Sequence, residues 1–143
     1  MPKKKKLQIT LSFSSRNFMP LFLFILLGLL LSACSGGQGS PAAKAIESYH
    51  EALVAGDADR LANLSCANWE QDAQTELDSF AAVTVRLEDA ACHEQGKDGE
   101  STLVSCTGKI IANYNGEDLE IDLADRTYVA TYEAGEWRMC GYR

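Results

Sequence analysis

Acidic residues are absent from the first 33 positions of this 143-residue chain, although twenty of them follow in the rest. Basic residues are sparse in that remainder, where eight stand against the twenty acids and give residues 34–143 a formal charge of −12. Because a phosphate backbone is held by clustered Lys and Arg, this balance argues against a nucleic-acid partner. An anionic lipid surface also repels such a domain unless an anchor holds it there.

Sequence motifs of several enzyme classes are missing as well. There is no G-x-S-x-G of a serine hydrolase and no glycine-rich loop for a phosphate. His50 stands off the apolar stripe of the first predicted helix, so we expect it to be a solvated surface residue, and His93 near a turn to be exposed too. We therefore predict no catalysis and no cofactor. The remaining candidate acids and hydroxyls, which no motif singles out, are Asp78, Asp89, Tyr49, Tyr114 and Tyr128.

The spacings of common metal sites are also absent. No C-x-x-C pair occurs, which argues against zinc. Two acidic stretches, "DADR" (57–60) and "NGEDLEID" (115–122), lack the order of a calcium-binding loop. We therefore predict no metal site.

No apolar run is long enough to span a bilayer as a helix. The longest, residues 21–31, rises roughly 16 Å as a helix, whereas a span takes about 20 residues. It follows four lysines at positions 3–6 and Arg16, and this order of a basic and then an apolar region is typical of a secretory signal.

The cleavage region "LSAC", Leu31 to Cys34, resembles the lipobox of bacterial lipoprotein precursors. The resemblance implies cleavage between Ala33 and Cys34 and a diacylglycerol on the Cys34 sulfur. The alternative is an ordinary secretory cut with Cys34 incidental. Since two acyl chains anchor a protein stably, we predict attachment to the membrane through Cys34, on the extracytoplasmic face. Ser35 is not the aspartate of a retention signal, which favours the outer membrane in a two-membrane cell and the outer face of the cytoplasmic membrane otherwise.

We predict three regions along the chain. Residues 1–33 are a lipoprotein signal peptide, residues 34–40 are the lipidated cysteine and a flexible tether, and residues 41–143 are a single domain. The tether "SGGQGS" (35–40) has a mean reach of about 13 Å, so the domain is expected to lie close to the headgroups.

Helical spacing dominates the first part of the domain. Ser40 and Pro41 suit a helix start, and Gly56 suits its end. Asp57 can cap a second helix. The apolar pattern slips at residues 66–68 and resumes at helical spacing from residue 69 to residue 80, which predicts a break or a third short helix there. The apolar face of the first helix consists of Ala42, Ile46, Tyr49 and Leu53.

Alternating apolar and polar residues follow from position 82 onward and predict strands. A turn cluster at residues 96–100 and Asn115-Gly116, a strong hairpin signal, separate the first three strands. Two more are expected at residues 127–132 and 137–142. Helices followed by a meander of strands indicate an α+β fold, in which N-terminal helices pack on a curved antiparallel sheet of four to five strands, preceded by the signal-peptide helix.

Four cysteines remain once Cys34 is set aside, and an even number in an exported domain indicates two disulfides. Four cysteines allow three pairings. Cys92 and Cys106 flank the first turn symmetrically and can face each other across a hairpin, which leaves Cys66 for Cys140. We predict this pairing.

The stretch "YHEALVAGDADRLANLSCANW" (49–69) and the closing "GEWRMCGYR" (135–143) resemble small bacterial lipoproteins of the cystatin-like, nuclear transport factor 2-like superfamily. The similar features are A-x-x-A-G-D at the end of the first helix and G-x-W-x-x-C in the last strand. The resemblance implies a cone, a strongly curved sheet around a helix, whose open end is often a pocket. Members use it as a binding site, a dimer surface or an enzyme site.

Aromatic side chains are the predicted ligand-binding residues, because six of them lie on or near apolar faces of the predicted elements. We predict a non-catalytic module that binds a small apolar ligand or an envelope protein. A structural role in the cell envelope and a small isomerase- or dehydratase-type enzyme are the alternatives. The residues proposed as pocket lining are Tyr49, Trp69, Phe80, Tyr128, Tyr132 and Trp137.

Overall fold

Residues 39–143 are the part of the chain that the computed structural model describes; the predicted signal peptide and Cys34 lie outside them. Within this part three helices precede five strands, and the predicted α+β class is confirmed. The core and two disulfides all lie inside residues 39–143, which form one compact unit. None of the helices in this range is both long and apolar enough for a membrane span.

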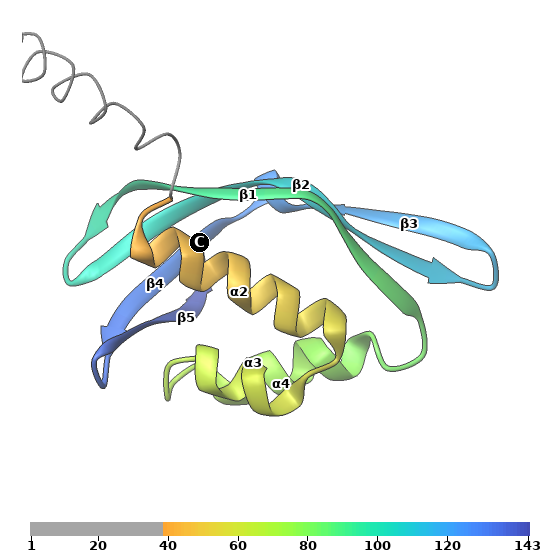
Figure 1. Cartoon of the computed structure of the whole chain (residues 1–143), viewed down its shortest axis with the longest axis horizontal. Coiled ribbons are helices and arrows are strands. Elements are labelled where there is room, and N and C mark those ends of the chain that lie inside the picture. Colours follow the sequence, from red (N-terminus) through yellow and green to blue (C-terminus); the bar gives the residue numbers. More distant parts are fainter. Residues whose placement is uncertain (1–38) are drawn as a thin grey trace, which may run out of the picture. The chain divides into compact units, whose positions relative to one another are not determined.

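Strand β2 (Ser101–Tyr114) is the centre of the sheet. Along one edge it pairs antiparallel with β1 (Thr84–Asp98). Along the other edge its C-terminal half pairs with β3 (Glu117–Asp122) and its N-terminal half with β4 (Thr127–Glu133). Strand β5 (Glu136–Tyr142) pairs with β4 and completes the antiparallel sheet, shown in Figure 1.

The expected meander is wrong at one step, because β4 pairs with β2 and not with β3. A short 3₁₀ turn, η2 (Leu123–Asp125), ends β3 and redirects the chain. Leu123 is buried in this turn, and its carbonyl oxygen accepts a hydrogen bond of 3.1 Å from the Tyr128 hydroxyl. The turn with the buried Leu123 thus lies where the chain leaves the C-terminal half of the β2 edge, which pairs with β3, and goes to the N-terminal half, which pairs with β4. The predicted Asn115-Gly116 hairpin is present, with positive φ at both residues.

The long hairpin of β1 and β2 is strongly curved and arches over the first helix, as Figure 1 shows. Its register shifts between Glu88 and Ala91, where Asp89 has a φ of 50°. On the facing strand, a Cβ at Gly108 would lie 2.5 Å from the Glu88 carbonyl oxygen, so only glycine allows this approach. Bulges bend strands, and this one lies in the middle of the hairpin.

Two of the three described helices begin at the capping residues of the sequence. Helix α2 (Pro41–Ala55) starts at Ser40, whose hydroxyl accepts from the Ala43 amide at 3.2 Å, and ends at a left-handed Gly56. Helix α3 (Ala58–Leu64) is capped by Asp57, and α4 (Glu70–Ser79) follows Trp69.

Helix α2 forms the centre of the core. It contacts β1, β2, β4 and β5 on the sheet side and both α3 and α4 on the other. Its buried positions therefore form a wide band and not a narrow stripe: Ala42, Ala43, Ala45, Ile46, Tyr49, His50, Ala52 and Leu53.

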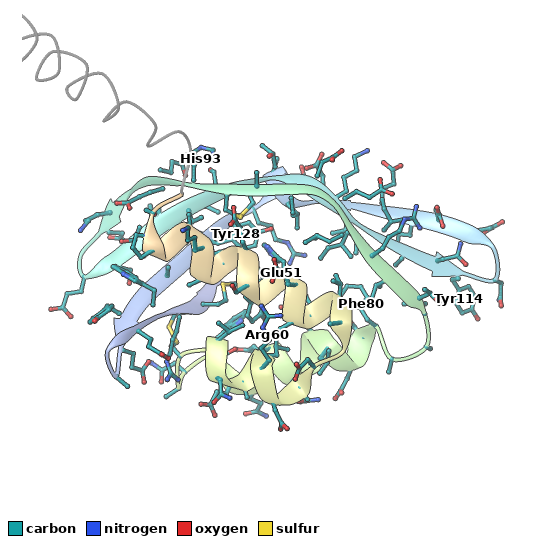
Figure 2. All side chains as sticks on the ribbon, in the orientation of Figure 1. Glu51, Arg60, Phe80, His93, Tyr114 and Tyr128 are labelled. Carbon is teal, nitrogen blue, oxygen red and sulfur yellow. A yellow bond between two sulfur atoms is a disulfide. The ribbon has the colours of Figure 1, made fainter. Side chains whose placement is uncertain are left out.

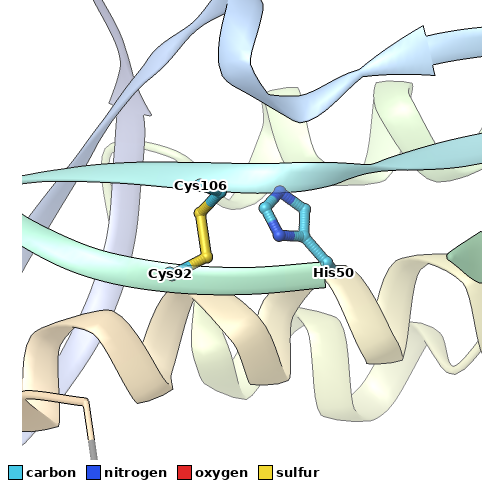
Figure 3. A group of neighbouring side chains, drawn as sticks. All are labelled: His50, Cys92 and Cys106. Carbon is cyan, nitrogen blue, oxygen red and sulfur yellow. A yellow bond between two sulfur atoms is a disulfide. The ribbon is translucent and has the colours of Figure 1, made fainter. Parts of the chain in front are cut away.

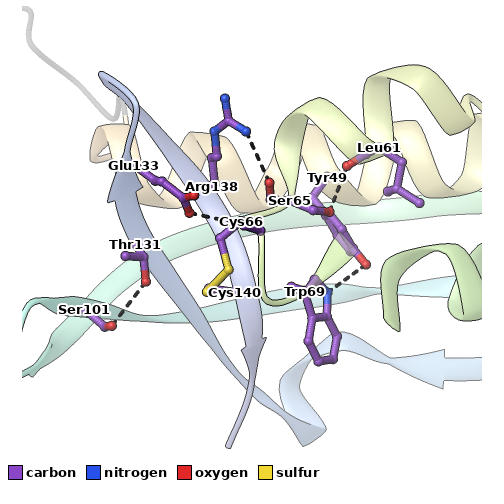
Figure 4. Close-up of a disulfide and its surroundings, with 11 residues drawn as sticks. Tyr49, Leu61, Ser65, Cys66, Trp69, Ser101, Thr131, Glu133, Arg138 and Cys140 are labelled. Carbon is purple, nitrogen blue, oxygen red and sulfur yellow. Dashed lines mark hydrogen bonds between the residues drawn. A yellow bond between two sulfur atoms is a disulfide. The ribbon is translucent and has the colours of Figure 1, made fainter. Parts of the chain in front are cut away.

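Both disulfides join the residues paired by the sequence analysis. Cys92 and Cys106 are direct cross-strand partners in β1 and β2. Cys66 follows α3 and is bonded to Cys140 in β5, with 5.3 Å between the two Cα atoms. Beside this bond, shown in Figure 4, the Cys66 amide donates to the Met139 carbonyl oxygen at 2.8 Å. The second disulfide therefore ties the helical segment to the last strand.

Candidate functional site

A cavity of about 480 Å³ lies between helices α2 and α4 and strands β2, β3, β4 and β5. This volume is in the range of pockets that hold small molecules. Figure 2 labels two aromatic residues of its lining, Phe80 after α4 and Tyr128 in β4. Apolar side chains make up much of the wall: Leu53, Phe80, Ile110, Leu119, Ile121 and Leu123.

His50 belongs to the wall of this cavity, and the expectation that it is a surface residue is wrong. Its exposed fraction is 1%. The ring packs edge-on against Tyr128, with 4.8 Å between the ring centroids. The sequence held a signal for this burial, because His50 stands four positions after Ile46 and three before Leu53.

No hydrogen bond reaches either ring nitrogen of His50 from the residues of the described domain, and Nδ1 is buried without a partner. Burial, followed by the nearby positive charge of Arg126, lowers the pKa of His50 from 6.5 to about 4. His50 is therefore a neutral imidazole at pH 7 with unused hydrogen-bonding capacity. Most buried polar groups are paired, so this one calls for a functional explanation.

Glu76 joins a second set of polar groups at the cavity. Its carboxylate accepts hydrogen bonds from the hydroxyls of Tyr49 at 2.6 Å and Tyr142 at 2.5 Å. Trp69 donates to the Tyr49 oxygen at 3.1 Å (Figure 4). Burial and the Glu76 charge raise the pKa of both tyrosines well above their ordinary value of 10, so the hydroxyls remain donors.

Arg126 provides the positive charge of the lining. Its side chain is 49% exposed, lies 3.6 Å from the Glu76 carboxylate and stacks over the Tyr142 ring at 4.7 Å from the centroid. Asp122 supplies a second carboxylate, which accepts from the Ala124 amide. The cavity lining thus carries one more negative than positive charge.

The six aromatic residues proposed as pocket lining divide into three pairs. Phe80 and Tyr128 line the cavity. Tyr49 and Trp69 are not part of the lining but connect to it, because Tyr49 donates to Glu76 and Trp69 donates to the Tyr49 oxygen. Tyr132 and Trp137 pack against each other near the β4–β5 turn and are outside the lining, so that prediction is wrong for them. Apolar periodicity predicts that these two residues lie on an inner face of the sheet. It does not show which end of the strands packs against the helices.

The candidate acids of the sequence also lie elsewhere. Asp78 and Asp89 are exposed, and Asp78 borders a second, separate hollow lined by the ends of α2 and α4 and the start of β1. Tyr114 is exposed near the tip of the β2–β3 hairpin, and His93 is exposed on β1. Glu76, Arg126 and Tyr142 line the cavity but were not among the predicted site residues, because no local pattern places them at one site.

One cluster has the composition of a metal site. A ring nitrogen of His50 and the sulfurs of Cys92 and Cys106 lie within 4.8 Å of one another. Figure 3 shows the three side chains. The two sulfurs are bonded to each other, so neither is a thiolate that could coordinate a metal. The cluster therefore does not fit a metal ion.

Comparisons with known proteins find no matching family model and no matching curated protein. Among solved structures, this chain is similar to a candidate ketosteroid isomerase from Shewanella frigidimarina, with 14% identity, a TM-score of 0.47, and 70% of this chain and 90% of that chain covered. It is also similar to the helical cell shape determining protein Pgp2 from Campylobacter jejuni, with 8% identity, a TM-score of 0.46, and 69% of this chain and 38% of that chain covered.

A third similar structure is an NTF2-like protein with a cystatin-like fold from Novosphingobium aromaticivorans. The identity is 14%, the TM-score 0.43, and 89% of this chain and 86% of that chain are covered. With TM-scores below 0.5, none of these likenesses assigns an activity, a ligand or a partner to this chain.

Proposed function

We propose that this protein is a lipid-anchored, extracytoplasmic module that binds a small apolar molecule in the cavity beneath its sheet. The observation that carries the proposal is the apolar cavity, whose wall contains the buried, unpartnered His50. A polar group in such a place loses its hydrogen bonds to water and regains them only from a ligand or an ordered water. The cavity therefore offers an apolar wall for the body of a ligand and His50 as a hydrogen-bonding group for its polar part.

The anchoring part of the proposal rests on the sequence. The basic and apolar regions of residues 1–31, the "LSAC" segment and the short glycine-rich tether are together typical of a lipoprotein precursor. Two disulfides suit an oxidising compartment outside the cytoplasm. A domain with a formal charge of −12 gains nothing from an anionic membrane surface, so the anchor on Cys34 would hold it there.

A second candidate function is catalysis at the same cavity, and the observation that favours it is a histidine with a shifted pKa in an apolar setting. A pKa of about 4 makes His50 a weak base at pH 7, where an efficient general base has a pKa near the working pH. Glu76 is also occupied by two tyrosine hydroxyls and Arg126. Binding is therefore the function that the geometry favours.

Native mass spectrometry of residues 35–143, exported from a bacterial host without reductant, tests the binding proposal. We expect a small molecule retained from the cell at one copy per chain, on a protein that has lost four hydrogens to two disulfides. Ser79→Trp places a bulky ring in the cavity lining and should abolish the adduct. Gln71→Trp adds the same ring on the same helix outside the lining and should keep it.

A bare, oxidised wild-type domain would contradict retention of a ligand and favour the alternative of an envelope-protein partner. Crosslinking in intact cells would then be the appropriate experiment. An adduct that survives Ser79→Trp would show that the molecule binds at some other surface.

A further inference from the structure

We infer that the cavity selects neutral molecules that carry a hydroxyl group on an apolar body, with His50 as the partner of that hydroxyl; this rests on the proposed binding function. The selectivity follows from which polar groups of the lining are already occupied and which one is not.

Every polar side chain of the lining except His50 has a protein partner. The Tyr128 and Tyr142 hydroxyls donate to the Leu123 carbonyl and to Glu76. Thr75 and Ser79 donate to backbone carbonyl oxygens of α4, and Asp122 accepts a hydrogen bond from the Ala124 amide. Arg126 forms a long-range ion pair with Glu76. His50 is therefore the one polar side chain of the lining that is buried and has no protein partner, whereas Arg126 is half exposed and pairs with Glu76.

The geometry of His50 points to a hydroxyl as that ligand group. Its Nδ1 is sealed from solvent, so Nε2 is the nitrogen through which the ring of this cavity-lining residue can meet a ligand. In a neutral imidazole Nε2 is a donor in one tautomer and an acceptor in the other. A hydroxyl both donates and accepts, so it pairs with either form, whereas a carbonyl pairs with one only.

The charges around the cavity act against anionic ligands. Glu76 and Asp122 outnumber Arg126, and Arg126 is already paired with Glu76. The domain as a whole carries a large negative charge, which repels a carboxylate or sulfate before it reaches the cavity mouth. A neutral alcohol or phenol escapes this repulsion.

Equilibrium dialysis of residues 35–143 at pH 7 against three matched probes tests the inference. The probes are naphthalene, 2-naphthol and 2-naphthoate, which share one apolar body and differ in the polar group. We expect 2-naphthol to bind about fivefold more tightly than naphthalene, which is the effect of one net neutral hydrogen bond. We expect 2-naphthoate to bind more weakly than 2-naphthol by at least about tenfold.

Variants of the two histidines separate the role of His50 from a general effect. His50→Phe keeps a flat ring and should reduce the ratio of 2-naphthol to naphthalene affinity to about one, while naphthalene binding shows that the variant is folded. His50→Gln retains a donor and an acceptor and should keep part of the preference. His93→Phe, on the exposed face of β1, should change nothing.

The outcomes distinguish this inference from the proposed function. Equal binding of naphthalene and 2-naphthol by the wild-type domain would overturn the ligand class and leave the pocket in place. A preference that persists in His50→Phe would overturn the role of His50. Failure of all three probes to bind the folded domain would contradict the proposed function itself.

Discussion

Replacing Cys66 and Cys140 together by alanine is expected to lower the free energy of unfolding by about 4 kcal/mol. The disulfide joins residues 74 positions apart and so closes most of the domain into one loop. Cross-linking a loop of this length removes much of the conformational freedom of the unfolded chain, and the gain grows with the logarithm of loop length. Urea unfolding of residues 35–143 under non-reducing conditions measures the loss.

The matched control is the double alanine variant of Cys92 and Cys106, whose sequence separation is 14. The shorter loop predicts a smaller loss of about 3 kcal/mol. A loss below about 1 kcal/mol for Cys66 and Cys140 would contradict their role as the main covalent tie. A non-reducing peptide map that joins Cys66 to Cys92 or Cys106 would contradict the pairing itself.

Cys34→Ser is expected to move the protein from the membrane fraction to the soluble exported fraction almost completely. The cysteine sulfur is the predicted attachment point of the diacylglycerol, and the serine variant loses both of its acyl chains. Because apolar chain burial contributes about 0.8 kcal/mol per methylene, two chains change the membrane partition by many orders of magnitude. Fractionation of intact cells followed by mass measurement of the mature chain provides the readout.

Ser35→Ala is the matched control, because it changes the neighbouring residue and keeps the thiol. This variant should remain in the membrane fraction after a high-salt wash, as the wild type should. A wild-type protein that is soluble after export, or a Cys34→Ser protein that stays in the membrane, would contradict the lipid anchor.

Local signals account for the features that the sequence predicted correctly. The Ser40 cap, the left-handed Gly56 and the Asn115-Gly116 turn depend on neighbours a few residues away, and each occurs where the sequence indicates. The Cys92 and Cys106 pair follows from the symmetry of a hairpin, so it too required little knowledge of the whole fold.

The features that the sequence did not predict depend on packing between residues far apart in the chain. His50 was assigned to the surface because a helix on a sheet needs one apolar face, but α2 is covered by the sheet on one side and by α3 and α4 on the other. Glu76, Arg126 and Tyr142 meet only because β4 moves to the free half of the β2 edge. No local pattern contains that step, which depends on the burial of Leu123.

A buried, neutral histidine lines the cavity, and NMR titration of the two imidazole rings tests this most directly. Burial disfavours the charged ring, so His50 should remain neutral as the pH falls from 7 through 6.5 and gain its proton only near pH 4. His50→Gln and His93→Gln assign the two sets of ring signals. A His50 ring that titrates near 6.5 in the folded domain would show that it is solvated, and would contradict the account of the cavity.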